Sequence, residues 1–565
     1  METKRAILIS FAINLYFLLL CIIFGDLRFG AVDDWFMAGT LSGIFGSGNN
    51  VHLTFVNALY GYCLLPLYHF FPTINWYYIG EMASIFVSLT VIGCIIVKKV
   101  GEKWGSVFTV LLAALCASDF YLVLQFTQCA SMLTAAGMLA FFYGLEKKEE
   151  CSTKLWVVPM LAGTLLLWWG SWMRWPAFLM GMPFFATLLL LHIKKFRQIK
   201  IAVIVWLIVF IVGANEFHYF NSTLYATPDY KKYIDFQAPR SLLGDGQNYN
   251  HQAVSEDLDE IGFSGKDYSL LTNWNFYDNN VFSPESIHVV TEAISQHYYK
   301  PSFSSLPIKI LATLNNSTKS PIFFVWFIFC LDLFFFKSSQ RKWPWVSLII
   351  VIILMSYLLN LQRFVYRVET GLWLYAGVGA ISLMKKRAAF SNIIFFIIMA
   401  SMVLFNFFSY ATTGFQVRSP NTGELILKQA DKSDSADFKG LFAYIDSASD
   451  TTFFMMSMTS YMRLTYHKFP PYLAEPKGSW EQILSFGFWT PYFPDIERAF
   501  RKRGISNPMK DVVLDNVFVI DEPYLVDFLE RHYYNKVEID TVRNFNGMVV
   551  YKYSIAGDSV AGVGE

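Results

Sequence analysis

The sequence predicts a mainly α-helical, polytopic membrane protein with about eleven transmembrane helices and a small extracytoplasmic α/β domain at its C-terminal end. Of the 565 residues, 54% are hydrophobic and 16% are charged, whereas soluble domains carry about 25% charged residues. Many apolar runs reach about twenty residues, the length at which a helix crosses a hydrocarbon core of about 30 Å. The net charge of +1 gives no indication of a nucleic-acid partner.

Eleven apolar runs form the predicted membrane helices. The first run follows a short basic start at residues 1–5, and no small-residue cleavage site comes after it. We therefore expect an uncleaved anchor rather than a signal peptide. The runs occupy residues 6–25, 78–97, 105–124, 129–145, 155–173, 176–193, 201–215, 320–336, 344–360, 371–384 and 391–410.

A further apolar stretch, residues 52–71, is expected to lie along the membrane surface without crossing it. It contains His52, Asn57, Pro66 and His69, and such polar positions are typical of interfacial helices. If it does not cross, every basic cluster between the spans faces the cytoplasm, as the positive-inside rule requires. The clusters are Lys4/Arg5, Lys98/Lys99/Lys103, Lys147/Lys148/Lys154, Lys194/Lys195/Arg197/Lys200, Lys337/Arg341/Lys342 and Lys385/Lys386/Arg387.

This topology divides the chain into four parts and places it in a cell membrane, the inner membrane of a bacterium, with its N-terminus in the cytoplasm. Residues 1–215 form an N-terminal membrane module whose first outer loop, 26–77, is long. Residues 216–319 form a polar, acidic outer loop, and 320–411 the last membrane helices. Residues 412–565 form the extracytoplasmic domain.

Alternating strand and helix patterns in the last part predict its α/β character. Strand-like runs occur at 451–456, 516–520 and 547–553, and helical runs at 438–445, 494–504 and 522–533.

Two adjacent carboxylates, Asp33 and Asp34, follow the first span in the sequence "AVDDWF". One interpretation is that Asp33 caps the helix "WFMAGTLSG", because acidic residues stabilise a helix N-terminus. The other interpretation is functional. The pair lies at the outer face, where lipid-linked substrates present their polar heads, and other ionisable residues gather there.

Those residues are mostly arginines, because the short outer loops contain Arg28, Arg174, Arg363 and Arg367 but no lysine. A planar guanidinium binds phosphate through two parallel hydrogen bonds, which lysine cannot do. Arg363 and Arg367 are four residues apart, so on a helix they share one face and would suit a diphosphate or phosphodiester. The alternative is that the arginines anchor the chain at the lipid interface, and for Arg28 this alternative is favoured.

Four other ionisable residues are site candidates. Asp119 lies in the outer half of the third span, where a carboxylate is costly and indicates function by default. Glu81 and Glu369 lie near the outer face. His52 would bind a metal or a sugar hydroxyl, although a lone histidine is more often structural. Asp34 and Asp119 are the candidate ligands for a divalent cation, magnesium or manganese.

These features resemble those of the GT-C class of membrane glycosyltransferases, which use polyprenyl-phosphate-linked sugars. In that class a long first outer loop starts with an acidic motif and carries one or two interfacial helices. Here "AVDDWF" and "HLTFVNALYGYCLLPLYHFF" occupy these places. Seven spans up to residue 215 match the module that the class shares, and bacterial members often end in a soluble outer domain. The WWD motif is absent, which argues against the oligosaccharyltransferase branch.

The resemblance implies transfer of a sugar from a polyprenyl-phosphate donor to a glycan, lipid or protein acceptor at the outer face. It implies that Asp33 is the general base, and that Asp34 orients it or binds a metal. Arg363 and Arg367, with Arg174 or a divalent cation, would stabilise the leaving phosphate.

Three alternatives stay open. A transporter or flippase would show paired interrupted spans and midplane charges, whereas the charges here gather at one face. A surface polysaccharide polymerase or ligase would depend on the later outer loops and tolerate loss of Asp33. A scaffold in an envelope-assembly complex would depend on no single charge.

No P-loop, zinc spacing, GxGxxG or GxSxG motif occurs, which removes ATP-driven transport by this chain and argues against a serine hydrolase.

Overall fold

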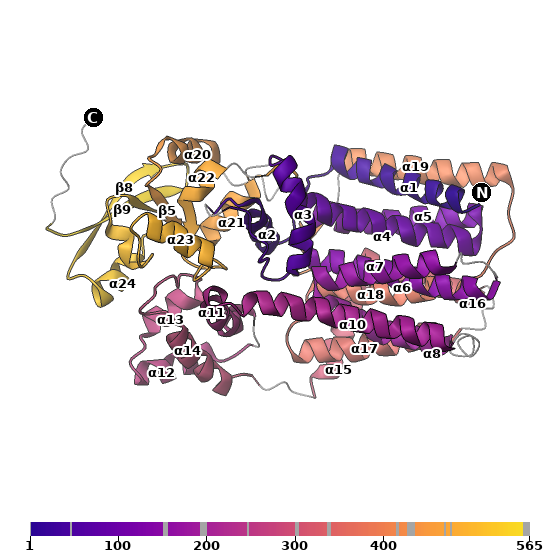
Figure 1. Ribbon diagram of the computed structural model, residues 1–565, viewed down its shortest axis with the longest axis horizontal. Helices are drawn as coiled ribbons and strands as arrows, with labels where there is room; N and C mark the ends of the chain where they lie inside the picture. Colours follow the sequence, from indigo (N-terminus) through magenta and orange to yellow (C-terminus); the bar gives the residue numbers. More distant parts are fainter. Residues whose placement is uncertain are drawn as a thin grey trace.

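The structure is a computed structural model of the whole chain. Figure 1 shows a bundle of long helices at one end and a head that contains a β-sheet at the other. The first helix begins at the end of the bundle that is remote from the head. Residues 2–45, 48–150, 156–192, 200–245, 248–299, 304–335, 341–413, 417–426, 436–467, 471–474 and 477–557 are described below, and Lys154, Lys194, Lys195, Arg197 and Lys337 of the basic clusters lie outside them.

The described residues confirm a mainly helical protein with several helices long and apolar enough to cross a membrane. There are seven such helices in the described ranges, or eight if the bent pair α15 (Leu306–Ser317) and α16 (Pro321–Phe335) forms one span. The predicted number of eleven stays a prediction. The seven are α1 (Glu2–Phe24), α4 (Trp76–Val100), α5 (Glu102–Ala117) with the π-helical turn η1 (Ser118–Leu122), α6 (Phe126–Glu150), α10 (Lys200–Tyr225), α17 (Trp343–Asn360) and α19 (Asn392–Thr413).

Three shorter helices complete the bundle at other predicted runs, namely α7 (Val157–Met173), α8 (Trp175–Leu191) and α18 (Tyr366–Ser382). The central helix is α6, which packs against α4, α7, α8 and α18. Glycines allow α6 and α7 to approach closely: a Cβ on Gly137 would lie 2.8 Å from the carbonyl oxygen of Gly163. Small residues at such contacts are typical of helix pairs in membranes.

The first outer loop carries two short helices, α2 (Val32–Ser42) and α3 (Ala58–Phe70). Helix α2 ends at Gly43, whose φ of 79° lets its N–H reach the carbonyls of Gly39 and Thr40. Helix α3 has 13 residues, a length of about 20 Å, which is too short to cross the bilayer. Figure 1 shows α3 running across the end of the bundle. The interfacial position of residues 52–71 stays a prediction.

The C-terminal part of the head contains a five-stranded sheet in the order β6-β5-β7-β9-β8. Strand β5 is parallel to β6 and β7, whereas β9 is antiparallel to β7 and β8. Its strands are β5 (Phe453–Met456), β6 (Ile483–Ser485), β7 (Val517–Ile520), β8 (Val537–Asn544) and β9 (Val549–Ile555), and its helices are α20 (Phe438–Ser447), α21 (Met458–His467), α22 (Lys477–Gln482), α23 (Pro494–Lys502), η4 (Lys510–Val513) and α24 (Leu525–His532).

The acidic loop after α10 folds onto this sheet domain. Its helices are α11 (Pro228–Asp245), α12 (His251–Glu260), α13 (Gly265–Thr272) and α14 (Pro284–Gln296). The Phe276 N–H donates to the carbonyl of Phe486 over 3.0 Å, and Arg531 binds both carboxylate oxygens of Asp267. The sequence suggested two separate outer segments, and the structure packs them together. We call residues 228–299 and 436–557 the head.

Two small strand pairs connect other parts of the chain. Strand β1 (Arg28–Phe29) runs parallel to β2 (Val123–Leu124), so the residues just before α2 are fixed to the segment between η1 and α6. Strand β3 (Val417–Arg418) pairs with β4 (Leu425–Ile426) after the last bundle helix.

Candidate functional site

Asp33 lies in the first turn of α2 and bonds to the head. The helix begins at Val32, and its N-cap is Ala31, which makes no side-chain capping bond. The interpretation of Asp33 as the cap is therefore wrong. Its Oδ1 instead accepts a hydrogen bond from the indole Nε1 of Trp489 over 2.9 Å. Asp33 is half-buried, and this bond holds its carboxylate in place.

Trp489 lies in the loop that follows β6, residues 486–493, which we call the Trp489 loop. This loop leaves the sheet at the carboxyl ends of the parallel strands, the edge at which α/β sheets usually bind ligands. Phe488 and Tyr492 in the loop have positive φ angles of 66° and 61°. Such conformations cost about 1–3 kcal/mol each and cluster at functional sites.

Trp274 of the head packs against the same loop. Its φ is also positive, at 64°, and a Cβ on Gly487 would come within 1.9 Å of the Trp274 carbonyl oxygen. Only glycine fits at residue 487, because backbone occupies the space that a side chain would need. The strained backbone is therefore concentrated where the loop presents Trp489.

Arg240 of α11, which also belongs to the head, stacks on Trp489. Its guanidinium carbon lies 4.3 Å from the centre of a Trp489 ring and 4.8 Å from that of Trp274. Its Nε and Nη2 donate to Gln237 Oε1 over 3.0 and 2.8 Å, and Gln237 donates to the carbonyl of Pro491 in the Trp489 loop. Arg240 is only 1% exposed, and a cation at such depth is costly unless it has partners of this kind.

Arg174 approaches from the bundle, at the junction of α7 and α8. Its guanidinium carbon lies 5.1 Å from the centre of the Phe55 ring and 5.3 Å from that of Phe126. The Phe55 ring in turn lies edge-on to Trp489, with 4.7 Å between ring centres. The first outer loop, the bundle and the head therefore meet here. We call Asp33, Arg174, Arg240, Trp489, Phe55 and Phe126 the Asp33 cluster.

Asp34 turns away from its neighbour and into the bundle. It is fully buried, and its Oδ1 accepts hydrogen bonds from the Phe126 N–H over 3.1 Å and from the Tyr77 hydroxyl over 3.3 Å. Burial, with a smaller contribution from the charge on Asp33, raises the pKa of Asp34 to about 8. The other sequence candidate nearby, Glu81 of α4, is buried against Asp34.

Asp119 also has a partner within the bundle. It lies on the π-helical turn η1, and its Oδ2 accepts a hydrogen bond from the hydroxyl of Tyr366 in α18. A π-helical turn inserts an extra residue and redirects the side chains that follow. The bond ties α18 to the π-helical turn at the C-terminal end of α5.

The expected divalent cation stays a prediction. Among the described residues, no group of three or more His, Cys, Asp or Glu side chains is placed to hold a metal ion. Asp34 and Asp119, the candidate ligands, instead bind Tyr77 and Tyr366. We therefore derive no step through a metal.

His52 packs the first outer loop against the head. Its ring stacks on Tyr230 with 3.7 Å between ring centres, and its Nδ1 bonds to Asn50 Oδ1 over 2.7 Å. Burial lowers the pKa of His52, which favours the neutral ring. Glu369 is buried in α18. Neither residue is among those of the Asp33 cluster.

Arg363 and Arg367 do not share a helix face. Helix α18 begins at Tyr366, and Gln362 has a positive φ of 55°, so Arg363 lies on a turn before the helix. The expectation of one common face is therefore wrong. Arg363 is exposed and Arg367 is half-buried. The neighbours of Arg363 line an open pocket of about 460 Å³, whose walls are Asn248, Tyr299, Lys309, Leu359, Gln362 and Phe364.

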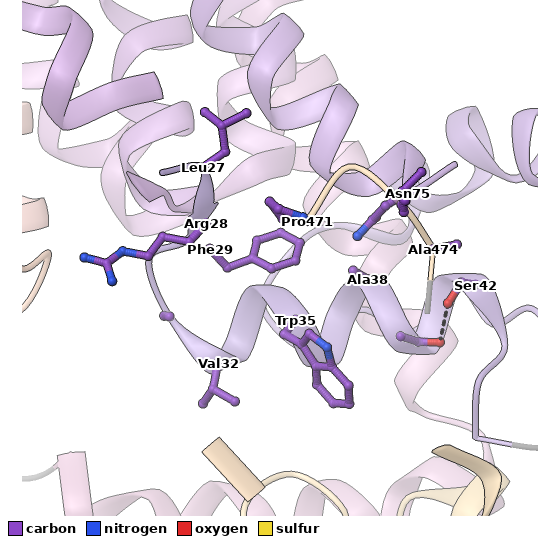
Figure 2. Close-up of a pocket in the computed structure, with 13 residues that line it drawn as sticks. Leu27, Arg28, Phe29, Val32, Trp35, Ala38, Ser42, Asn75, Pro471 and Ala474 are labelled. Carbon is purple, nitrogen blue, oxygen red and sulfur yellow. Dashed lines mark hydrogen bonds between the residues drawn. The ribbon is translucent and has the colours of Figure 1, made fainter. Parts of the chain in front are cut away.

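A second, small pocket lies on the side of α2 that carries Trp35. Figure 2 shows it between Phe29, Trp35 and Asn75, with Pro471 and Ala474 of the head beside them and the Arg28 side chain pointing away. Its volume is about 40 Å³.

Sequence reasoning missed Trp489 and Arg240. Arg240 follows "QAP" in an acidic loop, and a single arginine there reads as a surface charge. The run "SFGFWTPYF", aromatic and rich in turn residues, was the one signal for the Trp489 loop. In comparisons with known proteins, no family model, curated protein or solved structure matches this chain.

Proposed function

We propose that this protein is a membrane glycosyltransferase that moves a sugar from a polyprenyl-phosphate donor to a glycan, lipid or protein acceptor at the outer face of the cell membrane. One observation carries the proposal. The half-buried Asp33 carboxylate is held by Trp489. The Trp489 ring contacts Arg240 and Phe55, and Phe55 in turn contacts Arg174, where the bundle meets the head. A base, two cations and aromatic surfaces in one place are the groups that this reaction requires.

Asp33 is the general base in this mechanism. The acceptor hydroxyl attacks the anomeric carbon, a new C–O bond forms, and the hydroxyl proton passes to a carboxylate oxygen within about 3 Å. An ionised carboxylate has about four acceptor positions. The Trp489 N–H occupies one of them on Oδ1. It fixes the orientation of the carboxylate that takes the proton.

The cations stabilise the leaving group. As the bond from the anomeric carbon to the phosphate oxygen breaks, the polyprenyl phosphate gains negative charge. Guanidinium groups placed before the reaction lower the barrier most strongly where water is excluded. Arg174 is half-buried at the end of the bundle, and Arg240 is buried in the head. A phosphate whose charge is stabilised by both guanidinium groups would therefore lie between the membrane and the head. Arg363 and Arg367 remain candidates for holding the lipid phosphate on its way to this place.

Comparison of glycans tests the proposal. Lipid-linked and surface glycans are analysed by mass spectrometry from cells with the active chain and from cells without it. We expect the polyprenyl-phosphate sugar to accumulate and one sugar to be missing from a surface product. A shortened polymer with unchanged composition would indicate a polymerase instead, and unchanged glycans would contradict the proposal.

A further inference from the structure

Two buried carboxyl groups, Asp34 of α2 and Glu81 of α4, face each other next to the Asp33 cluster. Both side chains are fully buried. Asp34 Oδ1 has its two donors, the Phe126 N–H and the Tyr77 hydroxyl. Asp34 Oδ2 and both Glu81 oxygens have no donor among the described residues. Buried acceptors of this kind are normally paired, so the three oxygens need an explanation.

Among the described residues, the titratable groups recorded as acting on the pair carry no positive charge. The titratable side chains that face the pair are Asp33, Tyr77, Tyr60, Tyr78 and Cys129, and all of them are acids. Two ionised carboxylates in contact at such a site repel each other and lack solvation. A single proton between them removes one charge and creates the missing donor.

We propose that Asp34 and Glu81 share one proton, and that Glu81 is thereby a positioning residue for Asp33. The O–H···O bond ties the first turn of α2 to α4, while Asp34 Oδ1 ties the same turn to the start of α6. Asp33 is the preceding residue on that turn, so its direction depends on this bond. The effect on catalysis rests on the proposed function of Asp33, but the shared proton does not.

Infrared spectroscopy tests the proton directly. The purified protein in lipid nanodiscs at neutral pH is compared with Glu81→Gln. The glutamine amide donates to Asp34 Oδ2 without a carboxyl proton, so the carbonyl-stretch band of a protonated carboxyl group is expected to disappear. The matched control is Glu102→Gln, at a half-exposed glutamate that pairs with Arg5, and it should keep the band. No difference between wild type and Glu81→Gln would overturn the proposal.

Sugar transfer tests the positioning role. Glu81→Gln keeps the bond to Asp34 and should keep kcat near the wild-type value. Glu81→Leu removes the bond and should lower kcat roughly ten- to a hundred-fold, with little change in KM, because misplacement of a catalytic group costs rate. A Glu81→Leu variant that folds and keeps the wild-type kcat would overturn the positioning role. If Asp33 proves dispensable, the proposed function fails, while the infrared result still decides whether the pair shares a proton.

Discussion

The indole N–H of Trp489 donates a hydrogen bond to Asp33 Oδ1 across 2.9 Å, and this bond joins two residues that are 456 positions apart in the chain. It links the first outer loop to the head at the point where Arg174 and Arg240 also meet aromatic rings. The head is therefore part of the candidate site, because it supplies the donor that orients the candidate base.

The first prediction concerns that donor. Trp489→Phe keeps an aromatic ring against Phe55 and Arg240 and removes the N–H. A hydrogen bond to a charged group contributes about 1.5–3 kcal/mol, so kcat should fall about ten- to a hundred-fold while the protein stays folded. The control is Trp345→Phe at an exposed tryptophan of α17, which should change nothing. Wild-type kcat in Trp489→Phe would mean that the bond has no role in transfer.

The second prediction tests whether the planar shape of the two arginine side chains matters in addition to their charge. Arg240→Lys and Arg174→Lys keep the charge and lose the planar, forked donor that stacks on the rings and binds phosphate. Each variant should reduce transfer about ten-fold or more. Arg501→Lys, at an exposed arginine in the last turn of α23, is the matched control. If both site variants transfer at the control rate, the two guanidinium groups only support packing.

The third prediction concerns pH. Burial raises the pKa of Asp34 from an ordinary value near 4 to about 8, so the folded state binds more protons than the unfolded state between these values. The free energy of unfolding should therefore decrease as pH rises through that window, by up to about 1.4 kcal/mol per pH unit for one proton. Because Glu81 is buried beside Asp34, the double variant Asp34→Asn/Glu81→Gln should flatten the dependence. Thermal midpoints between pH 5 and 9 check this, and equal slopes in both proteins would contradict it.

The fourth prediction concerns topology. If residues 52–71 do not cross the membrane, the exposed Thr73 faces outward. A cysteine there should react with an impermeant thiol reagent on intact cells, in a background whose exposed Cys63 has been replaced. Labelling only after permeabilisation would contradict the topology, because all later helices would then be inverted.

Local patterns predicted much of the fold. The apolar runs form helices because, inside a membrane, a long apolar segment has few other ways to satisfy the hydrogen bonds of its backbone N–H and C=O groups. The strands at 453–456, 517–520 and 549–555 agree with the apolar runs in the sequence. Strand β6 was missed because it has three residues, and β8 because most of its side chains are exposed and polar.

The candidate site was predicted only in its local part. Asp33 was found from its place after the first span, but only the family resemblance, and no local pattern, gave it a role different from that of Asp34. That difference depends on which carboxylate faces the bundle. Trp489 and Arg240 were missed because their roles depend on contacts between distant segments. Arg363 was predicted to lie on a helix because it is four residues from Arg367. In the structure a turn at Gln362 precedes α18, which begins only at Tyr366.

Replacing Asp33 by Asn tests the central claim most directly. The asparagine oxygen still accepts the Trp489 N–H, so the link to the head is kept, but the base is removed. The control is Asp26→Asn, at an exposed aspartate earlier in the same loop. The measurement is sugar transfer from a synthetic polyprenyl-phosphate donor by purified, folded protein. We expect Asp33→Asn to lower the rate at least about 10²-fold and Asp26→Asn to leave it unchanged. Transfer by Asp33→Asn at the wild-type rate would mean that Asp33 is not the general base.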